Sequence, residues 1–77
     1  MHYQRLKDLR EDHDLKQREI ADLLHTTQQQ YNKYEQGIRE LPIHHLITLA
    51  RFYKTSTDYI LGLTNQQKPY RFTDDNE

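Results

Sequence analysis

Apolar residues recur every three or four positions along most of the chain, which is the spacing of one face of a helix. Leu6 and Leu9 show this spacing near the start, and Ile20, Leu23 and Leu24 show it again further on. The pattern predicts five short helices, at residues 3–12, 17–24, 28–36, from residue 42 onward, and 57–61.

Residues that begin or end helices stand at the limits of these segments. Thr27 is followed three positions later by Gln30, which makes a Thr-x-x-Gln capping box in which each side chain bonds the backbone of the other. Gly37 and Gly62 fit the left-handed position that ends a helix. The other start signals are Pro42, which suits a first turn, and the N-cap residue Ser56.

The fourth helix carries the strongest apolar stripe. An i, i+3, i+4, i+7 pattern is expected to face the core and is made by Ile43, Leu46, Ile47 and Ala50. Three further apolar residues widen that stripe, namely Leu49, Phe52 and Tyr53. We therefore predict that this helix forms the centre of the core and that Phe52 or Tyr53 lies near its edge.

The composition fits one small all-helical domain and excludes several other classes. The chain has 77 residues, with only two glycines and two prolines, which argues against a many-turned β protein. It has no cysteine, so a disulfide framework, a thiolate zinc site and a cysteine nucleophile are excluded. No apolar run reaches the roughly 18 residues of a membrane span.

No group of residues predicts catalysis or metal binding. His44 and His45 are adjacent and point about 100° apart on a helix, so they cannot hold one ion together. The other histidines lack ligand spacing, and there is no glycine-rich phosphate loop and no nucleophile beside a base. We therefore expect no enzyme activity, no metal and no cofactor.

The net charge is zero over the predicted helices and negative in the segment that follows them. The chain has 11 basic and 12 acidic residues, so it is not a polycation that coats nucleic acid nonspecifically. We place the domain at residues 1–63, with nine charges of each sign, and a polar C-terminal tail at residues 64–77. The tail is either a solvated end or an arm that docks Tyr70 and Phe72 on its own domain or on a partner subunit.

The predicted helices at residues 17–24 and 28–36 are joined by a three- or four-residue turn, which is the arrangement of a helix-turn-helix. Any helical bundle contains such pairs, so the composition of the third helix matters more. Tyr31 and Tyr34 supply its inner face, and its other side chains are amides and a lysine. Glutamine and asparagine can make two hydrogen bonds to the adenine edge in the major groove.

Residues 3–63 resemble the phage-repressor and Xre-like helix-turn-helix family. The segments that carry the resemblance are Arg5–Arg10, Leu15–Ala21, Thr26–Gly37 and Leu41–Gly62. The resemblance implies a compact, all-α, lambda-repressor-like domain of five helices. In that fold the second helix of the pair enters the major groove and the first lies across the DNA backbone.

The resemblance also implies roles for individual positions. Gln28, Gln29 and Lys33 match the base-contacting positions of the recognition helix. Arg10 and Glu35 match an ion pair that ties the first helix to the end of the third. Contacts with DNA phosphates are implied for Gln17, Gln36 and Arg39, and we expect them also from Lys16, Thr27 and Asn32.

Three positions depart from the family pattern without removing a contact residue. Lys16 stands where the family has serine or threonine, and the loss of such a cap costs roughly 1 kcal/mol. His25 replaces the turn glycine, in a left-handed position that histidine tolerates better than most residues. Thr26 replaces an apolar turn residue.

Together these observations predict a sequence-specific DNA-binding transcriptional regulator of bacterial or phage type, working on double-stranded DNA in the cytoplasm. One short recognition helix covers too few base pairs to specify a genomic site, so we expect a homodimer on a pseudo-palindromic operator. The dimer contact is expected at the fifth helix and the start of the tail, around Ile60, Leu61 and Leu63.

The alternative is a protein-interaction module, or an antitoxin, that keeps the fold with weak or no DNA binding. Residues 14–40 hold four bases against five acids, which favours this alternative. The C-terminal tail is then the segment that would bind a protein partner. The amide-rich third helix favours DNA, and we give it more weight.

Overall fold

Five α-helices make up most of residues 3–68, which are the residues that this computed structural model describes. The helices are α1 (Gln4–Asp12), α2 (Gln17–Leu23), α3 (Gln28–Gln36), α4 (Ile43–Phe52) and α5 (Thr57–Leu61). The all-α fold predicted from the sequence is therefore confirmed for this part of the chain. None of its helices has the length and apolar character needed to cross a membrane.

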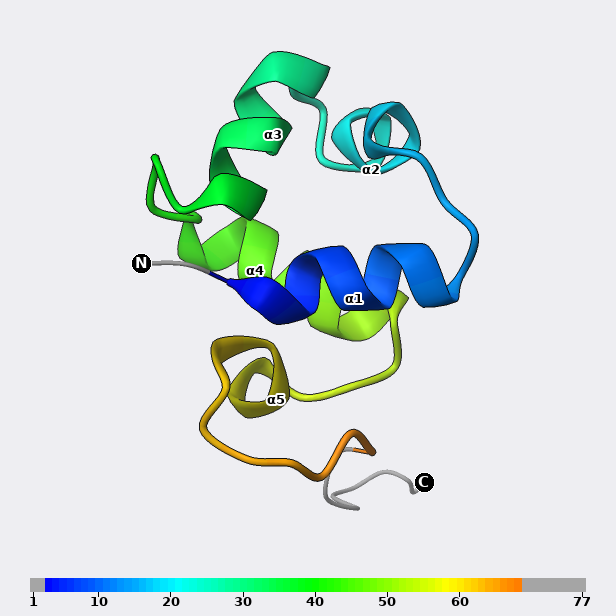
Figure 1. Cartoon of the computed structure of the whole chain (residues 1–77), viewed down its shortest axis with the longest axis vertical. Helices are drawn as coiled ribbons and strands as arrows, with labels where there is room; N and C mark the ends of the chain where they lie inside the picture. The colour runs from blue at the N-terminus through cyan, green and yellow to red at the C-terminus, as the bar shows by residue number, and fades with distance from the viewer. Residues whose placement is uncertain (1–2, 69–77) are drawn as a thin grey trace.

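Helix α1 lies between the two ends of the molecule (Figure 1). The pair α2 and α3 lies at one end of the molecule, and α5 with the segment after it lies at the other. Helix α1 runs across the middle and packs against both α3 and α5, while α4 packs against α5. This arrangement leaves the outer side of α2 and α3 free of other helices.

Each helix contributes at least one fully buried side chain to a single core. These side chains are Leu6 and Leu9 of α1, Ile20 of α2, Tyr31 of α3, Leu49 of α4 and Ile60 of α5. Tyr3, Leu24, Tyr34 and Tyr53 complete the buried cluster together with Ala21, Leu41 and Ala50. The apolar positions predicted for the first two helices therefore face inward, as does the tyrosine pair of α3.

The predicted caps are present, except for one half of the capping box. The Thr27 hydroxyl accepts a hydrogen bond from the Gln30 backbone N–H at 3.1 Å, and Gly37 ends α3 with a φ of 78°. The Gln30 side-chain oxygen was expected to accept from the Thr27 backbone N–H, and that bond is not formed. The Gln30 side chain is instead directed one helical turn along α3, where its NH2 group donates to the Tyr34 hydroxyl at 3.2 Å.

The prediction of which side of α4 faces the core is wrong, because the helix is rotated about its axis relative to the predicted orientation. Ile43 is 74% exposed and Ile47 is 41% exposed. The core receives Leu49 and Tyr53 together with Ala50 of the predicted stripe, and Leu46 packs against it. Apolar residues cover more than half of this helix, so two stripes about 60° apart fit equally well, and spacing alone could not choose between them.

Arg5 of α1 holds the segment that follows α5. Its guanidinium donates to the backbone carbonyls of Tyr59 and Thr64 and to the Asn65 side-chain oxygen, and it lies 4.0 Å from the centre of the Tyr59 ring. The Thr55 hydroxyl donates to the backbone carbonyl of Gln67. Residues 64–67, which we assigned to the tail, are therefore held on the helices.

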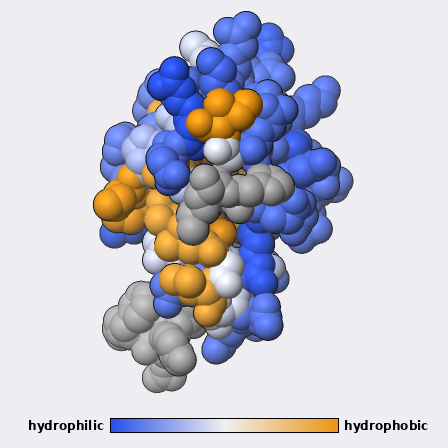
Figure 2. Space-filling view, turned by 60° about the vertical axis from the view of Figure 1, so that its left-hand side comes forward, coloured by the Kyte–Doolittle hydropathy of each residue, from blue (hydrophilic) through white to orange (hydrophobic). Residues whose placement is uncertain are grey.

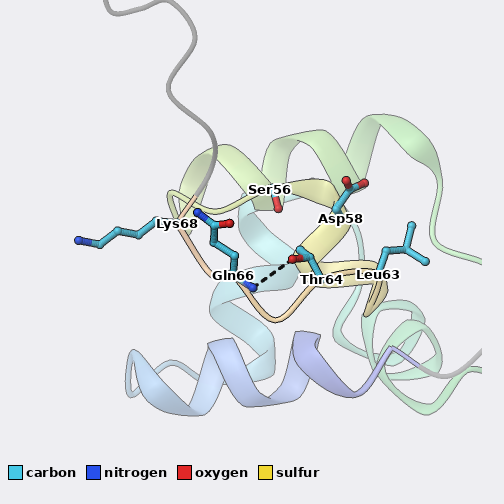
Figure 3. A pocket seen from close by; sticks show the side chains of 6 residues that line it. All are labelled: Ser56, Asp58, Leu63, Thr64, Gln66 and Lys68. Carbon is cyan, nitrogen blue, oxygen red and sulfur yellow. Dashed lines mark hydrogen bonds between the residues drawn. The ribbon is translucent and has the colours of Figure 1, made fainter.

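Residues 64–68, which we call the returning segment, form a small hollow against the start of α5. The hollow has a volume of about 290 Å³ and lies between Ser56, Asp58 and residues 63–68 (Figure 3). Within it the Gln66 backbone N–H donates to the Thr64 hydroxyl at 3.2 Å. The arm that we expected at Tyr70 and Phe72 lies outside the described residues.

Candidate nucleic-acid interface

The connection between α2 and α3 is a tight turn over residues 24–27. His25 has a φ of 57°, so the turn uses the left-handed conformation for which the sequence supplies no glycine. The Thr26 backbone N–H donates to the carbonyl of Ala21 at 2.9 Å, which closes the end of α2. The turn brings the two helices into direct contact at one end of the molecule (Figure 1).

Two tyrosines fix which side of α3 faces outward. Tyr31 is fully buried and Tyr34 is 5% exposed, and their rings meet edge to face with centroids 6.4 Å apart. Because these residues anchor the inner face, Gln28 and Gln29 lie exposed at the first turn of α3. Lys33 is half-buried further along the helix.

A hydrogen-bonded network joins α1, the start of α2, and α3. The Arg10 guanidinium donates to both oxygens of Glu35, at 2.7 and 3.2 Å, and also to the carbonyl of Leu15 at 2.9 Å. The Gln17 side-chain N–H groups donate to Glu35 Oε1, which also accepts from Arg10, at 3.1 Å and to the Asn32 side-chain oxygen at 2.9 Å. The network fixes α3 against α1 and the start of α2.

The ion pair at the centre of this network is largely shielded from water. The Arg10 side chain is 13% exposed and that of Glu35 is 4% exposed. Burial by itself raises the pKa of the Glu35 carboxyl, but the hydrogen bonds from Arg10 and Gln17 and the nearby Tyr31 hydroxyl outweigh it. The pKa of Glu35 therefore lies below its ordinary value.

This lowered pKa predicts a loss of stability in acid. Glu35 stabilises the fold fully above its unfolded pKa of about 4.5, and the contribution disappears as the pH falls through the lower folded pKa. We expect the melting temperature of the wild type to fall more steeply than that of Glu35→Gln between about pH 5 and about pH 2. Parallel melting curves for the two proteins across this range would contradict the assignment.

Polar side chains line two shallow hollows beside the exposed face of α3. One has a volume of about 410 Å³ and is lined by Gln17, Gln28, Gln29 and Asn32. The other has a volume of about 370 Å³ and continues toward α1 along Lys7, Gln36 and the Arg10–Glu35 pair. Open, amide-lined surfaces of this kind suit a polar ligand that lies along the surface.

The remaining residues with expected phosphate roles surround this face. Lys16 is exposed at the N-cap of α2, where its backbone N–H donates to the Glu19 carboxylate at 2.8 Å. That carboxylate replaces the cap that Lys16 cannot supply. Thr27 and Gln36 are exposed at the two ends of α3, and Arg39 is exposed in the loop that follows it.

The sequence did not indicate the bond between Gln17 and Asn32. Both amide protons of Gln17 are used by Asn32 and Glu35. The spacing of Asn32 and Glu35 could have suggested it, because residues three apart lie on one face of α3 and can share a partner.

Across residues 3–68, no cluster of three or more histidine, aspartate and glutamate side chains is placed to hold a metal ion.

Two short helices joined by a four-residue turn, with the second presenting polar side chains on an open face, define the helix-turn-helix class of DNA-binding fold. A family model described as helix-turn-helix matches residues 6–60. The chain belongs to the Xre/Cro-like helix-turn-helix family, which is a family of DNA-binding transcription regulators.

The chain is also similar to a curated bacterial protein. It is 39% identical over 69 residues to the protein named "Uncharacterized HTH-type transcriptional regulator YobD" of Bacillus subtilis (strain 168). The matched region covers 90% of this chain and 62% of that relative, so the chain spans less than two thirds of the relative's length. No solved structure matches the chain.

Proposed function

We propose that this chain is a sequence-specific regulator of transcription that acts on DNA in the cytoplasm, with α3 in the major groove. The observation that carries the proposal is the position of Gln28 and Gln29. They are exposed at the first turn of a helix whose other side is held by two buried tyrosines. Residues 1–63 form the DNA-binding domain in this proposal, and residues 64–77 are an appendage to it.

In the proposed complex, Gln28, Gln29 and Lys33 contact bases. The phosphate contacts come from Lys16, Gln17, Thr27, Asn32, Gln36 and Arg39. Gln17 has no spare amide proton in the free protein, so its contact requires exchange of its bond to Asn32 or Glu35. DNA binding and the network behind α3 are therefore coupled in this proposal.

The proposal can be tested by titrating the isotope-labelled chain with a duplex and following its side-chain amide signals by NMR. The signals of Gln28, Gln29 and Asn32 should shift most, because these groups enter the interface. Gln66 and Gln67 provide internal controls, since they lie beyond α5. Shifts confined to the side-chain amides of Asn65, Gln66 and Gln67 would contradict the proposal, and a spectrum that the duplex leaves unchanged would support the protein-interaction alternative.

We further propose that the chain binds DNA as a homodimer. The expected dimer contact needs one correction, because Ile60 is buried in the core and, of the three residues expected there, Leu63 is the one that is widely exposed, at 73%. In Figure 2 the half of the surface over α2 and α3 is mostly hydrophilic, and apolar side chains gather over α4 and α5. Leu63 therefore provides the apolar surface for a contact at the end remote from α3.

The dimer proposal predicts two protein chains for each palindromic duplex. Sedimentation at saturating protein should give a 2:1 complex that forms cooperatively, and Leu63→Asp should weaken the cooperativity without unfolding the domain. The matched control is Gln66→Asp, which introduces the same carboxylate at an exposed side chain nearby. A 1:1 complex without cooperativity would contradict the dimer.

The charge balance supports a second candidate function. Residues 14–40 carry more acids than bases, so attraction to phosphates is modest, and a protein-interaction module or antitoxin would need none. However, Glu35 is neutralised by Arg10, and Glu19 is engaged at the start of α2. Glu40 also accepts a hydrogen bond from the Tyr3 hydroxyl at 2.8 Å, so at least three of the five acids are engaged, which reduces the support for this alternative.

A further inference from the structure

A groove lies between the second half of α4 and the start of α5. It has a volume of about 540 Å³ and exposes more apolar than polar surface. Ile47 and Ala50 supply apolar lining, Arg51 and Lys54 supply two cations, and Thr55 to Thr57 close it at the far side. It lies outside the face of α2 and α3 to which we assign DNA binding.

The two cations of the groove have no acidic partner among residues 3–68. Both side chains are exposed, and the only ion pair formed within this part of the chain joins Arg10 to Glu35. A second copy of the groove is a poor occupant, because two-fold packing would place Arg51 and Lys54 against the same cations of the partner. The groove therefore suits a segment that carries both an apolar side chain and carboxylates.

Such a segment follows directly in the chain. The carbonyl of Gln67 accepts a hydrogen bond from Thr55, which itself lines the groove. Residues 69–77 include Phe72 and three acids, with a single base at Arg71. The described residues 3–68 carry 10 bases and nine acids, so the positive groove and the acidic segment are complementary in charge.

The length of the segment is sufficient. Ile47 lies four residues before Arg51 on α4, a separation of about 6 Å along the helix axis, and Lys54 follows just beyond the end of that helix. Phe72 lies five residues after Gln67 and can reach about 17 Å from it, while Asp75 can reach about 27 Å. Both the aromatic ring and the carboxylates can therefore lie within the groove without an extended chain.

We propose that residues 70–77 bind intramolecularly in the groove of α4 and α5, with Phe72 against Ile47 and Ala50 and with the carboxylates beside Arg51 and Lys54. Exposed ion pairs are individually weak and one aromatic contact is small, so the segment needs both to stay bound, and salt weakens the binding. The bound segment covers apolar surface at the α5 end and leaves α3 open.

The absence of cysteine from the natural sequence makes the proposal directly testable. Thr73→Cys in the full chain gives one site for a nitroxide label, whose paramagnetism weakens the NMR signals of nearby backbone amides. We expect the amides of Ile47, Arg51 and Thr57 to lose most of their intensity and those of α2 and α3 to keep theirs. Uniform intensities over the folded domain would overturn the proposal.

Charge variants separate the proposed contact from chance proximity. Arg51→Glu with Lys54→Glu should restore the intensities, whereas Lys7→Glu with Arg18→Glu, the same charge change elsewhere on the surface, should not. The variant Asp74→Asn, Asp75→Asn, Glu77→Gln should also restore them and leaves the helical residues unaltered. Persistence of the intensity loss in the last variant would overturn the proposal.

Mixing distinguishes an intramolecular segment from that of a second copy. Isotope-labelled protein without the nitroxide is combined with nitroxide-bearing protein that has no isotope label. Unchanged intensities in the mixture support binding within one chain. Intensity loss at the groove in the mixture identifies the segment of a second copy as the occupant and overturns the proposal, whatever the outcome of the DNA titration.

Discussion

Replacement of Glu35 with alanine is expected to lower the free energy of unfolding by about 3 kcal/mol, because it leaves a largely buried arginine without its charge partner. Arg10 is 13% exposed and donates to both oxygens of Glu35, so the lost carboxylate has no substitute nearby. Gln17 also loses one of its two acceptors. Thermal or denaturant unfolding of purified protein measures the effect.

The matched control is Glu11→Ala, which removes an exposed carboxylate of α1 that forms no hydrogen bond or ion pair with another side chain within residues 3–68. A surface substitution of this kind should stay within about 0.5 kcal/mol of the wild type. If Glu35→Ala unfolds at the same denaturant concentration as this control, the ion pair does not tie α1 to α3.

The second large effect is expected at the exposed amides of α3. Gln28→Ala or Gln29→Ala should each cost about 1–3 kcal/mol of discrimination at one or two base pairs, because the truncated side chain leaves a base edge without its paired hydrogen bonds. Competition binding with single-base variants of the preferred duplex measures that loss. The melting temperature should not change, since neither side chain contributes to the core.

Gln67→Ala is the control for this pair, because Gln67 has an exposed side chain and uses only its backbone carbonyl. It should bind every duplex as the wild type does. Retention of the full base preference in Gln28→Ala and in Gln29→Ala would remove both residues from the base-contacting set.

Local signals were sufficient to predict the helices. Thr27 and Ser56 accept hydrogen bonds from backbone N–H groups three residues later, and Gly37 and Gly62 adopt φ values of 78° and 80° where α3 and α5 end. Each of these effects acts within one helical turn. The predicted limits of the helices therefore agree with the structure to within a residue at most ends.

The errors arose where tertiary packing chooses among equivalent local solutions. On α4 the sequence offered two apolar stripes, and the choice depends on how the helix rolls against α5 and the rest of the core. The same holds for Ile60, which was expected at the surface and is 1% exposed. The Arg5 contacts with residues 59–65 also join parts of the chain that are too far apart for spacing to relate.

The sequence predicted which residues make up the candidate site better than it predicted the hydrogen bonds among them. The Arg10–Glu35 pair was expected from the family resemblance, and the structure forms it at 2.7 Å. The bond between Gln17 and Asn32 was not expected, because it depends on the orientation of α2 relative to α3. The base and phosphate contacts of the interface stay predictions.

The central claim is that this chain recognises a particular DNA sequence through α3. Selection from a pool of random duplexes with the purified full chain tests it most directly. The account predicts enrichment of a pseudo-palindromic sequence, with half-sites about one helical turn apart, and loss of that enrichment in Gln28→Ala, Gln29→Ala. A pool that stays random after repeated rounds, with protein that is folded throughout, would contradict the account.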